Sequence, residues 1–420
     1  MAATGLGMVF AGSLFGAQPL GQLGVALLVL ALVGVAVVRL GRHDVEITRQ
    51  LSPERARPSQ PVTVSIKVSN KGTGSAPLLL VEDKVPSGLS GSARFALRGI
   101  EAQGMREAAI TLTASRRGNY EIGPMEISIV DPFGLAQLRS TALDKSRFLV
   151  HPRIEPLALP RDLGDRRSMS MSTLRQPTGA RGEDFYTLRE YVEGDDLRKI
   201  HWPSTAKRGR FMIRQEETPW QTRATIVLDD RARAHDGFGD LSSFERAVEA
   251  AASLVDLYHR SGYGYRLTAA HAPGLPSGKR SEHWSRCLDL LATIGTGHDT
   301  GEDDALVARL MEIEAGASAE ASLVVVGGTL SARDALAVTR CRRRFREVTV
   351  VVFPSHRFSS QTTKSRWDGE KRLNEAVRLL TRSGVRAVAV GPEDPLGAAW
   401  AGLSPVRQQE ATWGRRPELV

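Results

Sequence analysis

The stretch "ATIVLDD", Ala224 to Asp230, is a short apolar run that ends in two acids, and buried strands of parallel sheets often have this pattern. The next stretch, 242–262, carries apolar residues at helical spacing and is expected to be a helix. Serines at its start can cap this helix, and Gly262 can end it. Strand-like and helix-like stretches then alternate up to residue 403. This alternation predicts an α/β domain over residues 224–403, with a parallel sheet covered by helices on both faces.

The other elements of this domain follow from the same two periodicities. Strands are expected over 263–271, 321–328, 347–354 and 385–392, and helices over 282–295, 304–316, 331–345 and 370–384. The stretch 355–369 shows no periodicity and is expected to be an exposed loop, while the tail 404–420 is expected to be flexible. Ligands of such sheets bind at the carboxyl ends of the strands, so residues 228–237 are the first place to look for a site.

Upstream, over residues 43–152, the apolar pattern has a period of two. "PVTVSIKVSN", Pro61 to Asn70, alternates valine and isoleucine with threonine, serine and lysine. Short strands separated by glycine, proline, serine and asparagine predict an antiparallel β-sandwich of immunoglobulin-like kind. No cluster of catalytic residue types occurs here, so we expect a spacer or a recognition module.

The N-terminus is apolar and predicts a transmembrane hairpin over residues 1–38, which contain no charged side chain. The stretch 20–38 would reach roughly 28 Å as a helix, close to the thickness of the hydrocarbon core. The stretch 4–17 is shorter and rich in glycine, and Gln18-Pro19 supplies a turn. Arginines 39, 42 and 49 follow the second span, so the rest of the chain is expected on the cytoplasmic side of a cell membrane.

The composition fits a multi-domain protein drawn to anionic partners. The chain has 420 residues, a net charge of +9 and a sequence pI of about 9.8. Anionic lipid accounts for this excess as well as nucleic acid does. The two cysteines, Cys287 and Cys341, lie in no metal-binding pattern, and a single disulfide between them stays open.

Residues 181–215, "RGEDFYTLREYVEGDDLRKIHWPSTAKRGRFMIRQ", form a dipolar stretch. Six acids and two bases over 181–197 are followed by six bases and no acid over 198–214. We interpret the segment 153–223 as a clamp between the two domains, in which Arg189 and Arg198 contact acids such as Asp195. An enzymatic alternative would use Glu183 or Asp195 as base, His201 as acid and Arg198 as an anion clamp.

A nucleic-acid alternative would use "AKRGRFMIR", 206–214, as a basic hairpin. The six acids upstream would oppose a phosphate backbone, and no recognised nucleic-acid module is present. A nucleic acid is therefore not expected as a partner, and the sequence identifies no small-molecule substrate. No Walker A, HExxH, GxGxxG or nucleophile-elbow pattern occurs in the chain, so no catalytic residue is assigned.

The same stretch resembles the signature of the bacterial domain-of-unknown-function 58 family. The matching positions are Gly182, Phe185, Leu188, Arg189, Tyr191, Gly194, Asp195, Arg198, Ile200, Trp202, Ala206 and Lys207. The resemblance extends from the anchor to at least residue 330. From the signature, the candidate interaction residues are Glu183, Phe185, Arg189, Tyr191, Gly194, Asp195, Arg198, Trp202 and Lys207.

This resemblance implies an architecture and a partner. Such proteins carry one or two N-terminal spans, a β-sandwich, the signature and a von Willebrand factor A-like domain, and they are associated with MoxR-type AAA+ ATPases. It therefore implies a membrane-anchored, non-enzymatic adaptor that presents the α/β domain to such an ATPase. Direct, cation-dependent recognition of a client is the alternative, and a hydrolase is the third possibility.

One departure from the A-domain pattern concerns metal. Metal-binding A domains place Asp-x-Ser-x-Ser after the first strand, whereas this chain has Asp229, Arg231 and Arg233. Arginine stays protonated and offers no lone pair, so it repels a cation. We therefore expect a degenerate metal site with no metal or other cofactor, although carboxylates at 230, 236 and 240 could build a different site.

Overall fold

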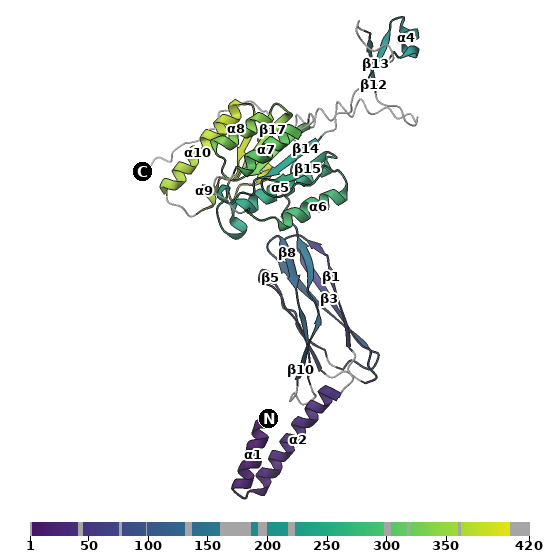
Figure 1. Ribbon diagram of the computed structural model, residues 1–420, viewed down its shortest axis with the longest axis vertical. Coiled ribbons are helices and arrows are strands. Elements are labelled where there is room, and N and C mark those ends of the chain that lie inside the picture. Colours follow the sequence, from purple (N-terminus) through teal and green to yellow (C-terminus); the bar gives the residue numbers. More distant parts are fainter. Residues whose placement is uncertain are drawn as a thin grey trace. The chain divides into compact units, whose positions relative to one another are not determined.

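The computed structural model describes residues 2–40, 45–74, 78–97, 99–130, 137–159, 186–191, 200–216, 223–297, 304–316, 320–359 and 363–403 (Figure 1). The chain divides into two compact units. The first comprises Met1–Arg153 together with Leu288–Ile294, and the second comprises Ile154–Cys287 together with Gly295–Val420. The predicted flexible tail, 404–420, lies outside the described residues.

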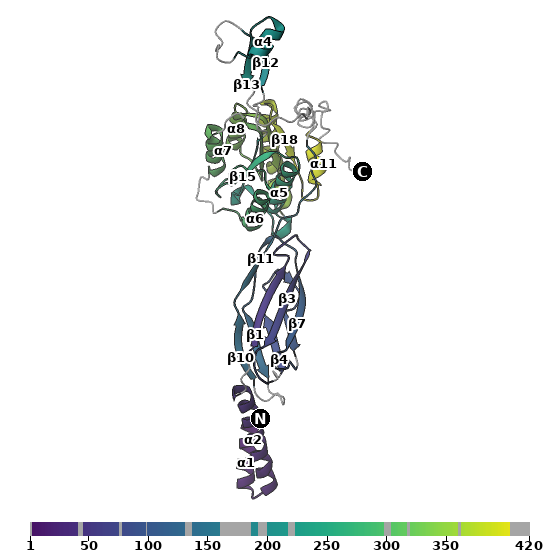
Figure 2. The ribbon, with the colours of Figure 1, turned by 90° about the vertical axis from the view of Figure 1, so that its right-hand side faces the viewer.

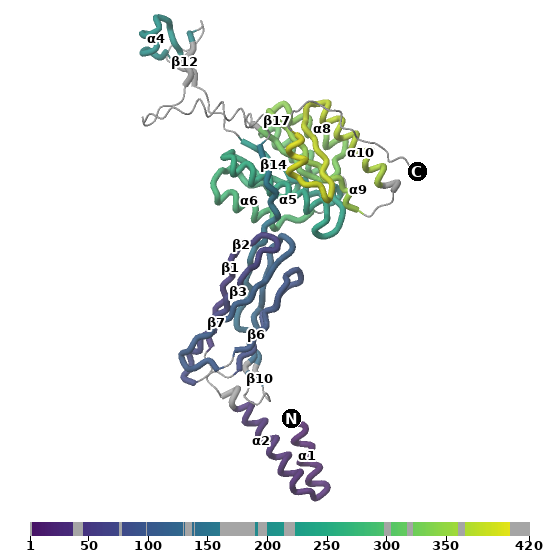
Figure 3. The backbone as a smooth tube through the Cα atoms, turned by 180° about the vertical axis from the view of Figure 1, so that it is seen from behind, coloured from purple at the N-terminus to yellow at the C-terminus, as the bar shows by residue number. Residues whose placement is uncertain are grey.

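The N-terminal helices α1 (Ala2–Leu14) and α2 (Gln18–Leu40) lie side by side (Figure 3). They approach closely through glycines: a Cβ on Gly24 would lie 2.7 Å from the carbonyl oxygen of Gly5, and one on Gly12 would lie 2.6 Å from the nitrogen of Gly21. Within α2, Gln18–Ala36 is long and apolar enough to cross a membrane, with a mean hydropathy of 2.2. Helix α1 is apolar but spans only about 20 Å.

Eleven strands follow in the described part of the first unit (Figure 2). They are β1 (Val45–Ser52), β2 (Arg55–Ala56), β3 (Pro61–Asn70), β4 (Leu78–Asp83), β5 (Leu89–Ser90), β6 (Arg94–Leu97), β7 (Met105–Ala114), β8 (Gly118–Ile122), β9 (Met125–Val130), β10 (Gln137–Leu143) and β11 (Ser146–Val150). They form sheets in the orders β1-β3-β7-β5, β10-β9-β4-β6 and β2-β11-β8. All pairings are antiparallel except that of β2 with β11.

The period-two pattern of the sequence predicts which side chains form the core of this unit. Along β3 the apolar side chains at 62, 64, 66 and 68 are buried while their neighbours are partly exposed. They pack in one core with Leu79 of β4, Leu112 of β7 and Ile127 of β9, so the core is shared by both four-stranded sheets. The prediction of a sandwich-like β-region is confirmed.

A buried ion pair links the two four-stranded sheets. Arg49 of β1 donates two hydrogen bonds from Nη1 to Asp83 at the end of β4, at 2.8 and 2.6 Å. Burial raises the pKa of Asp83, although the hydrogen bond from Arg49 opposes this. Arg49, counted in the sequence among the charges flanking the membrane span, is thus part of the sandwich interior.

The second unit contains a five-stranded parallel sheet in the order β15-β14-β16-β17-β18. The strands are β14 (Arg223–Leu228), β15 (Gly264–Ala269), β16 (Glu320–Gly327), β17 (Phe345–Val352) and β18 (Arg386–Ala389). The helices of this region are α5 (Ser243–Arg260), α6 (Ser281–Thr293), α7 (Ala305–Gly316), α8 (Ala332–Cys341), α9 (Ser355–Phe358), α10 (Thr363–Arg382) and α11 (Leu396–Ala401). The predicted α/β region is confirmed.

Helices cover both faces of this sheet (Figure 1). Helix α5 packs on β14, β15 and β16. Leu310 of α7, Val338 of α8 and Leu380 of α10 share a core with Val325 of β16 and Val350 of β17 on the other face. Ser242 caps α5, and the chain turns after it at Gly262 with φ +70°, as the sequence predicted.

The prediction of an exposed loop over 355–369 is wrong. Helix α9 covers 355–358, and α10 begins at Thr363, seven residues before the predicted start. His356 is 4% exposed, and its Nε2 lies 2.8 Å from Glu370 of α10. A Cβ on Gly369 would lie 2.5 Å from the His356 ring, so glycine lets this helix approach the ring. Tertiary contact rather than apolar periodicity therefore forms the first turns of α10.

The segment after the sandwich belongs to the second unit and is bonded to its helices. Glu155 accepts hydrogen bonds from Arg246 of α5 at 2.8 Å and from the backbone N–H of Leu396 at 2.9 Å. Its own N–H donates to the hydroxyl of Ser253 at 2.9 Å. The indole of Trp400 donates to the carbonyl oxygen of Ala158. Residues 155–158 are thus fixed on α5 and α11.

Candidate functional site

The order of the five strands marks one place on the sheet. Strand β14 lies between β15 and β16, so the chain leaves β14 towards one side and returns on its other side. In open α/β sheets, ligands bind at the carboxyl edge where the strand order reverses in this way. The loop 229–242 after β14 and the loop 328–331 after β16 lie at this edge.

Arg231 is buried at this edge between two carboxylates. Its guanidinium donates to Asp229 at 2.8 Å from both Nε and Nη2, and to Asp334 at 3.1 Å from both Nη1 and Nη2. The three residues are 0–3% exposed. Burial alone would lower the pKa of Arg231, but the two carboxylates outweigh it and raise that pKa above its ordinary value. The carboxylates therefore hold a permanent cation supplied by the chain itself.

Asp334 also begins helix α8. Its carboxylate accepts from the N–H and the hydroxyl of Ser331, and its own N–H donates to the Ser331 oxygen at 3.2 Å, which is a capping box. The same side chain thus fixes the start of α8 and one side of Arg231. Sequence reasoning missed Asp334, although the spacing Ser331-x-x-Asp334 before an apolar run is a recognisable signal.

Two glycines let the loops after β14 and β16 touch. A Cβ on Gly327 would lie 2.6 Å from the Cβ of Asp229, and one on Gly328 would lie 1.8 Å from the carbonyl oxygen of Ala234. That oxygen accepts a hydrogen bond from the N–H of Thr329 at 2.7 Å. The pair "GG" at the end of β16 is therefore required by backbone contact with the Arg231 loop.

His235 fixes the far side of the same loop. Its Nε2 donates to the carbonyl oxygen of Asp229 at 2.7 Å, and its Nδ1 lies 3.1 Å from the hydroxyl of Ser243 at the start of α5. Its ring packs edge-on against Phe244. Burial lowers the pKa of His235, with Asp229 opposing, so the neutral ring is favoured.

The other acids of the loop are used separately. Asp230 is buried, and its side chain accepts from the N–H groups of His271 and Ala272 after β15. Asp236 accepts from the N–H of Gly237, and Asp240 is exposed. Among the described residues, no three histidine, cysteine or acidic side chains are grouped so that they could hold a metal ion.

A cavity of about 400 Å³ opens beside the buried arginine. It is lined by Arg231, Arg233, Ala234, Asp304, Thr329, Leu330, Ser331, Arg333, Asp334 and Arg372. Arg333 pairs with Asp304 at 2.6 Å. We refer to it below as the arginine cavity.

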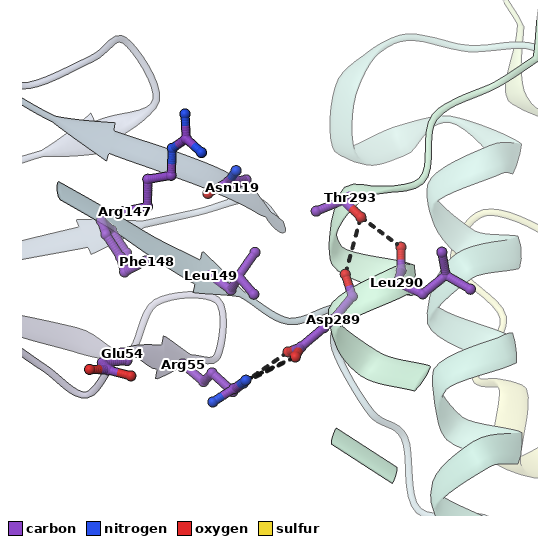
Figure 4. A pocket seen from close by; sticks show the side chains of 9 residues that line it. All are labelled: Glu54, Arg55, Asn119, Arg147, Phe148, Leu149, Asp289, Leu290 and Thr293. Atoms are coloured by element: carbon purple, nitrogen blue, oxygen red, sulfur yellow. Dashed lines mark hydrogen bonds and ion pairs between the residues drawn. The ribbon is translucent and has the colours of Figure 1, made fainter. Parts of the chain in front are cut away.

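The first unit has its own pocket of about 520 Å³ (Figure 4). Arg55 of β2 donates to both carboxylate oxygens of Asp289, and Nε2 of His151 lies 2.8 Å from the same carboxylate. Burial would raise the pKa of Asp289, but hydrogen bonds from Arg55 and His151 outweigh it and lower that pKa. Its central carboxylate, Asp289, is already paired with Arg55 and His151, so we interpret the pocket as structural.

Part of the signature forms a small hairpin. Strands β12 (Tyr186–Glu190) and β13 (Met212–Glu216) pair antiparallel, with the backbone of Arg189 opposite Ile213. Tyr191 packs edge-on against Phe211 at 6.2 Å between ring centroids. Trp202, 64% exposed, begins helix α4 (Trp202–Arg208), and Lys207 lies exposed in its last turn.

The structure does not test the predictions for the other signature residues. Glu183, Phe185, Gly194, Asp195 and Arg198 lie outside the described residues, and so does any contact of Arg189 or Arg198 with Asp195. His201, the acid of the enzymatic alternative, accepts a hydrogen bond from the N–H of Ser204 and caps α4. Its ring thus has a structural use.

The cysteines are both buried and free. Burial raises the pKa of each thiol to about 12. Neither forms a disulfide, and both behave as core side chains.

The fold and this edge define a protein with a β-sandwich unit and an α/β unit whose ligand edge is closed around an internal arginine. Residues 187–363 match the model of the family described as "Protein of unknown function DUF58". The resemblance inferred from the signature is confirmed over these residues. No curated protein matches the chain.

Similar solved structures cover about a quarter of the chain. A FixG-related protein from Vibrio parahaemolyticus is 13% identical over 25% of this chain and 95% of its own, with a TM-score of 0.18. A CARDB domain from Pyrococcus furiosus, solved with di-metal ions, is 13% identical over 26% and 91%, with a TM-score of 0.20. A non-cellulosomal cohesin from Archaeoglobus fulgidus is 12% identical over 29% and 97%, with a TM-score of 0.18. Similarity at this level carries no functional argument.

Arg231→Met should destabilise the second unit by about 3–5 kcal/mol, because it leaves two buried carboxylates without their cation. Urea unfolding of the detergent-solubilised chain, followed by tryptophan fluorescence, measures the loss. Arg233→Met, an exposed neighbour in the same loop, is the control and should cost less than about 1 kcal/mol. Equal losses of unfolding free energy in the two variants would contradict the buried ion-pair role given to Arg231.

His235→Gln should make stability less sensitive to acid. Because the folded pKa of His235 lies below the unfolded value of about 6.5, the unfolded chain binds the proton first. The stability that the neutral ring of His235 contributes is present above about pH 6.5 and is lost as the pH falls towards the folded pKa. Urea midpoints at about pH 7.5 and pH 5.5 should differ less in the variant than in the wild type, and an unchanged difference would refute the role given to this ring.

Proposed function

We propose that the chain is a membrane-anchored, non-enzymatic adaptor that presents a von Willebrand factor A-like domain to a cytosolic partner. The partner we propose, from the family resemblance, is a MoxR-type AAA+ ATPase of a chaperone system that matures protein complexes. One observation carries the proposal: the edge where such folds bind ligands is closed around Arg231 and displays large apolar side chains beside it. A preformed surface of this kind suits protein docking.

The anchor is supported by the surface of the N-terminal helices. Large apolar side chains on α1 and α2 are 42–72% exposed, namely Leu6, Phe10, Leu14, Leu23, Val25, Val29, Leu32, Val33 and Val35. Apolar surface of this extent is stable when lipid covers it. Gln18 and Pro19 begin α2, so the predicted turn lies earlier, at residues 15–17. Arg39 and Arg42 follow the span while this turn is uncharged, which supports a cytoplasmic body.

The docking surface is supported by two exposed side chains in the loop after β14. Phe238 is 93% exposed and Leu241 is 74% exposed. Aromatic and aliphatic side chains placed so openly on a structured loop are typical anchors of protein interfaces. We call these two residues the apolar pair.

The loop holds the apolar pair in place before any partner arrives. Ser243 donates its N–H to the carbonyl oxygen of Asp236 at 2.9 Å and accepts the N–H of Asp236 on its hydroxyl at 3.0 Å. Gly237 has φ +95°, and a Cβ there would lie 3.0 Å from the carbonyl oxygen of Phe358. A loop fixed in this way loses little entropy on binding, which favours affinity.

Two alternatives are less well supported. In the cation-dependent alternative, a metal would have to displace Arg231 from four hydrogen bonds and leave a guanidinium buried without a partner. In the hydrolase alternative, His201 would act as an acid, yet its side chain caps α4 and bonds Ser204.

The adaptor proposal is tested by purifying the tagged full chain from solubilised membranes of its own host and identifying co-purified proteins by mass spectrometry. We expect a MoxR-type ATPase with the wild type and at least about tenfold less with Phe238→Asp, because a charge replaces an interface anchor. Met311→Asp on α7 changes a side chain that is 48% exposed and serves as the matched control.

The proposal fails if the wild type recovers no such ATPase, or if both variants lose it equally. A chain without residues 2–40 controls for location and should leave the membrane fraction. Its retention on membranes would refute the proposed anchor.

A further inference from the structure

We propose that the arginine cavity is an oxyanion-binding site that takes a carboxylate or phosphate group. This goes beyond the adaptor role, because it assigns a ligand chemistry to the cavity whatever the partner is. The cavity lies where the strand order of the sheet reverses, and its volume of about 400 Å³ fits a small group of atoms.

The first support is the number of arginines that line one cavity. Four arginines, at 231, 233, 333 and 372, line the cavity with two aspartates, at 304 and 334. Asp229 lies against Arg231 as well. A bound anion would reduce the repulsion among these arginines.

The second support is the pairing within this set. Arg231 is held by Asp229 and Asp334, and Arg333 is held by Asp304. Arg372 of α10 forms no ion pair or hydrogen bond with any residue in the described part of the chain. Its guanidinium is therefore available to a ligand in the cavity.

The third support is the donor count of the buried arginine. A guanidinium has five N–H groups, and the bonds from Arg231 to Asp229 and Asp334 use four of them. The fifth, on Nη1, meets no side-chain acceptor within the described residues. A buried charged donor without an acceptor is costly, and Arg231 lines the cavity while being 1% exposed.

Thr329 and Ser331 also line the cavity, but their hydroxyl groups are bonded to Ser355 and Asp334. The arginines are therefore the donors of this site, and proteins use guanidinium forks for carboxylate and phosphate oxygens. The same donors repel metal cations, so the chemistry of this edge is the reverse of a cation site. The rigid bonding of Arg231 means that one part of the anion site is formed in advance.

The test is calorimetric titration of the full chain in detergent with two probes, inorganic phosphate and a short peptide of aspartate and glutamate. Sodium chloride of matched ionic strength is the reference. Saturable binding of either probe supports the site. Tighter binding of the peptide identifies a protein carboxylate as the source of the oxyanion, and tighter binding of phosphate identifies a small phosphorylated ligand.

Arg372→Glu should weaken binding by at least about tenfold, the loss expected for a hydrogen bond to a charged group. Arg378→Glu makes the same charge change at an exposed position of the same helix that does not line the cavity, and should leave affinity unchanged. Binding no stronger than the salt reference, or equal affinities in the two variants, would overturn the proposal. Neither outcome depends on the ATPase, so this site and the adaptor role can fail separately.

Discussion

The buried contact of Arg231 with Asp229 and Asp334 is the interaction on which this edge of the molecule depends. It joins the loop after β14 to the start of α8, which lies 103 residues later in the chain. Each of these charges would be expensive to bury alone, since removing one partner of a buried pair typically costs about 3–5 kcal/mol. Their joint burial therefore fixes both loops, and the glycines at 327 and 328 let the two backbones meet.

The buried guanidinium of Arg231 also limits which ligands can bind at this edge. Its carboxylates are already bonded to a guanidinium, so they present few free oxygens to a metal. What remains accessible is the arginine cavity and the apolar pair. Both are features of recognition surfaces, and neither includes a nucleophile beside a base. These two features are consistent with the proposed adaptor role and with anion binding in the arginine cavity.

Much of the fold could be predicted because burial imposes a period on the sequence. The alternation along Pro61–Asn70 gave β3, and the serine cap with Gly262 gave the limits of α5. The first turns of α10 could not be predicted, because their stability comes from the contact of Glu370 with His356, far from any apolar pattern. The partner of Arg49 could not be predicted for a similar reason, since the position of Asp83 is set by the packing of two sheets.

The candidate site was predicted in part. Arg231 and Arg233 could be singled out from the sequence, because they follow Asp229 at alternate positions after the first strand of the α/β region. Which carboxylates Arg231 contacts depends on the fold, because Asp334 comes from another loop. The two arginines also differ: Arg231 is buried, whereas Arg233 is exposed and lines the cavity. Sequence spacing cannot distinguish these two roles.

Titration of the full chain with Mg²⁺, Mn²⁺ and Ca²⁺ tests most directly whether Arg231 keeps divalent cations from Asp229 and Asp334. We expect heats equal to those of dilution into buffer. Stoichiometric binding of a divalent cation that disappears in Asp229→Asn would contradict this expectation.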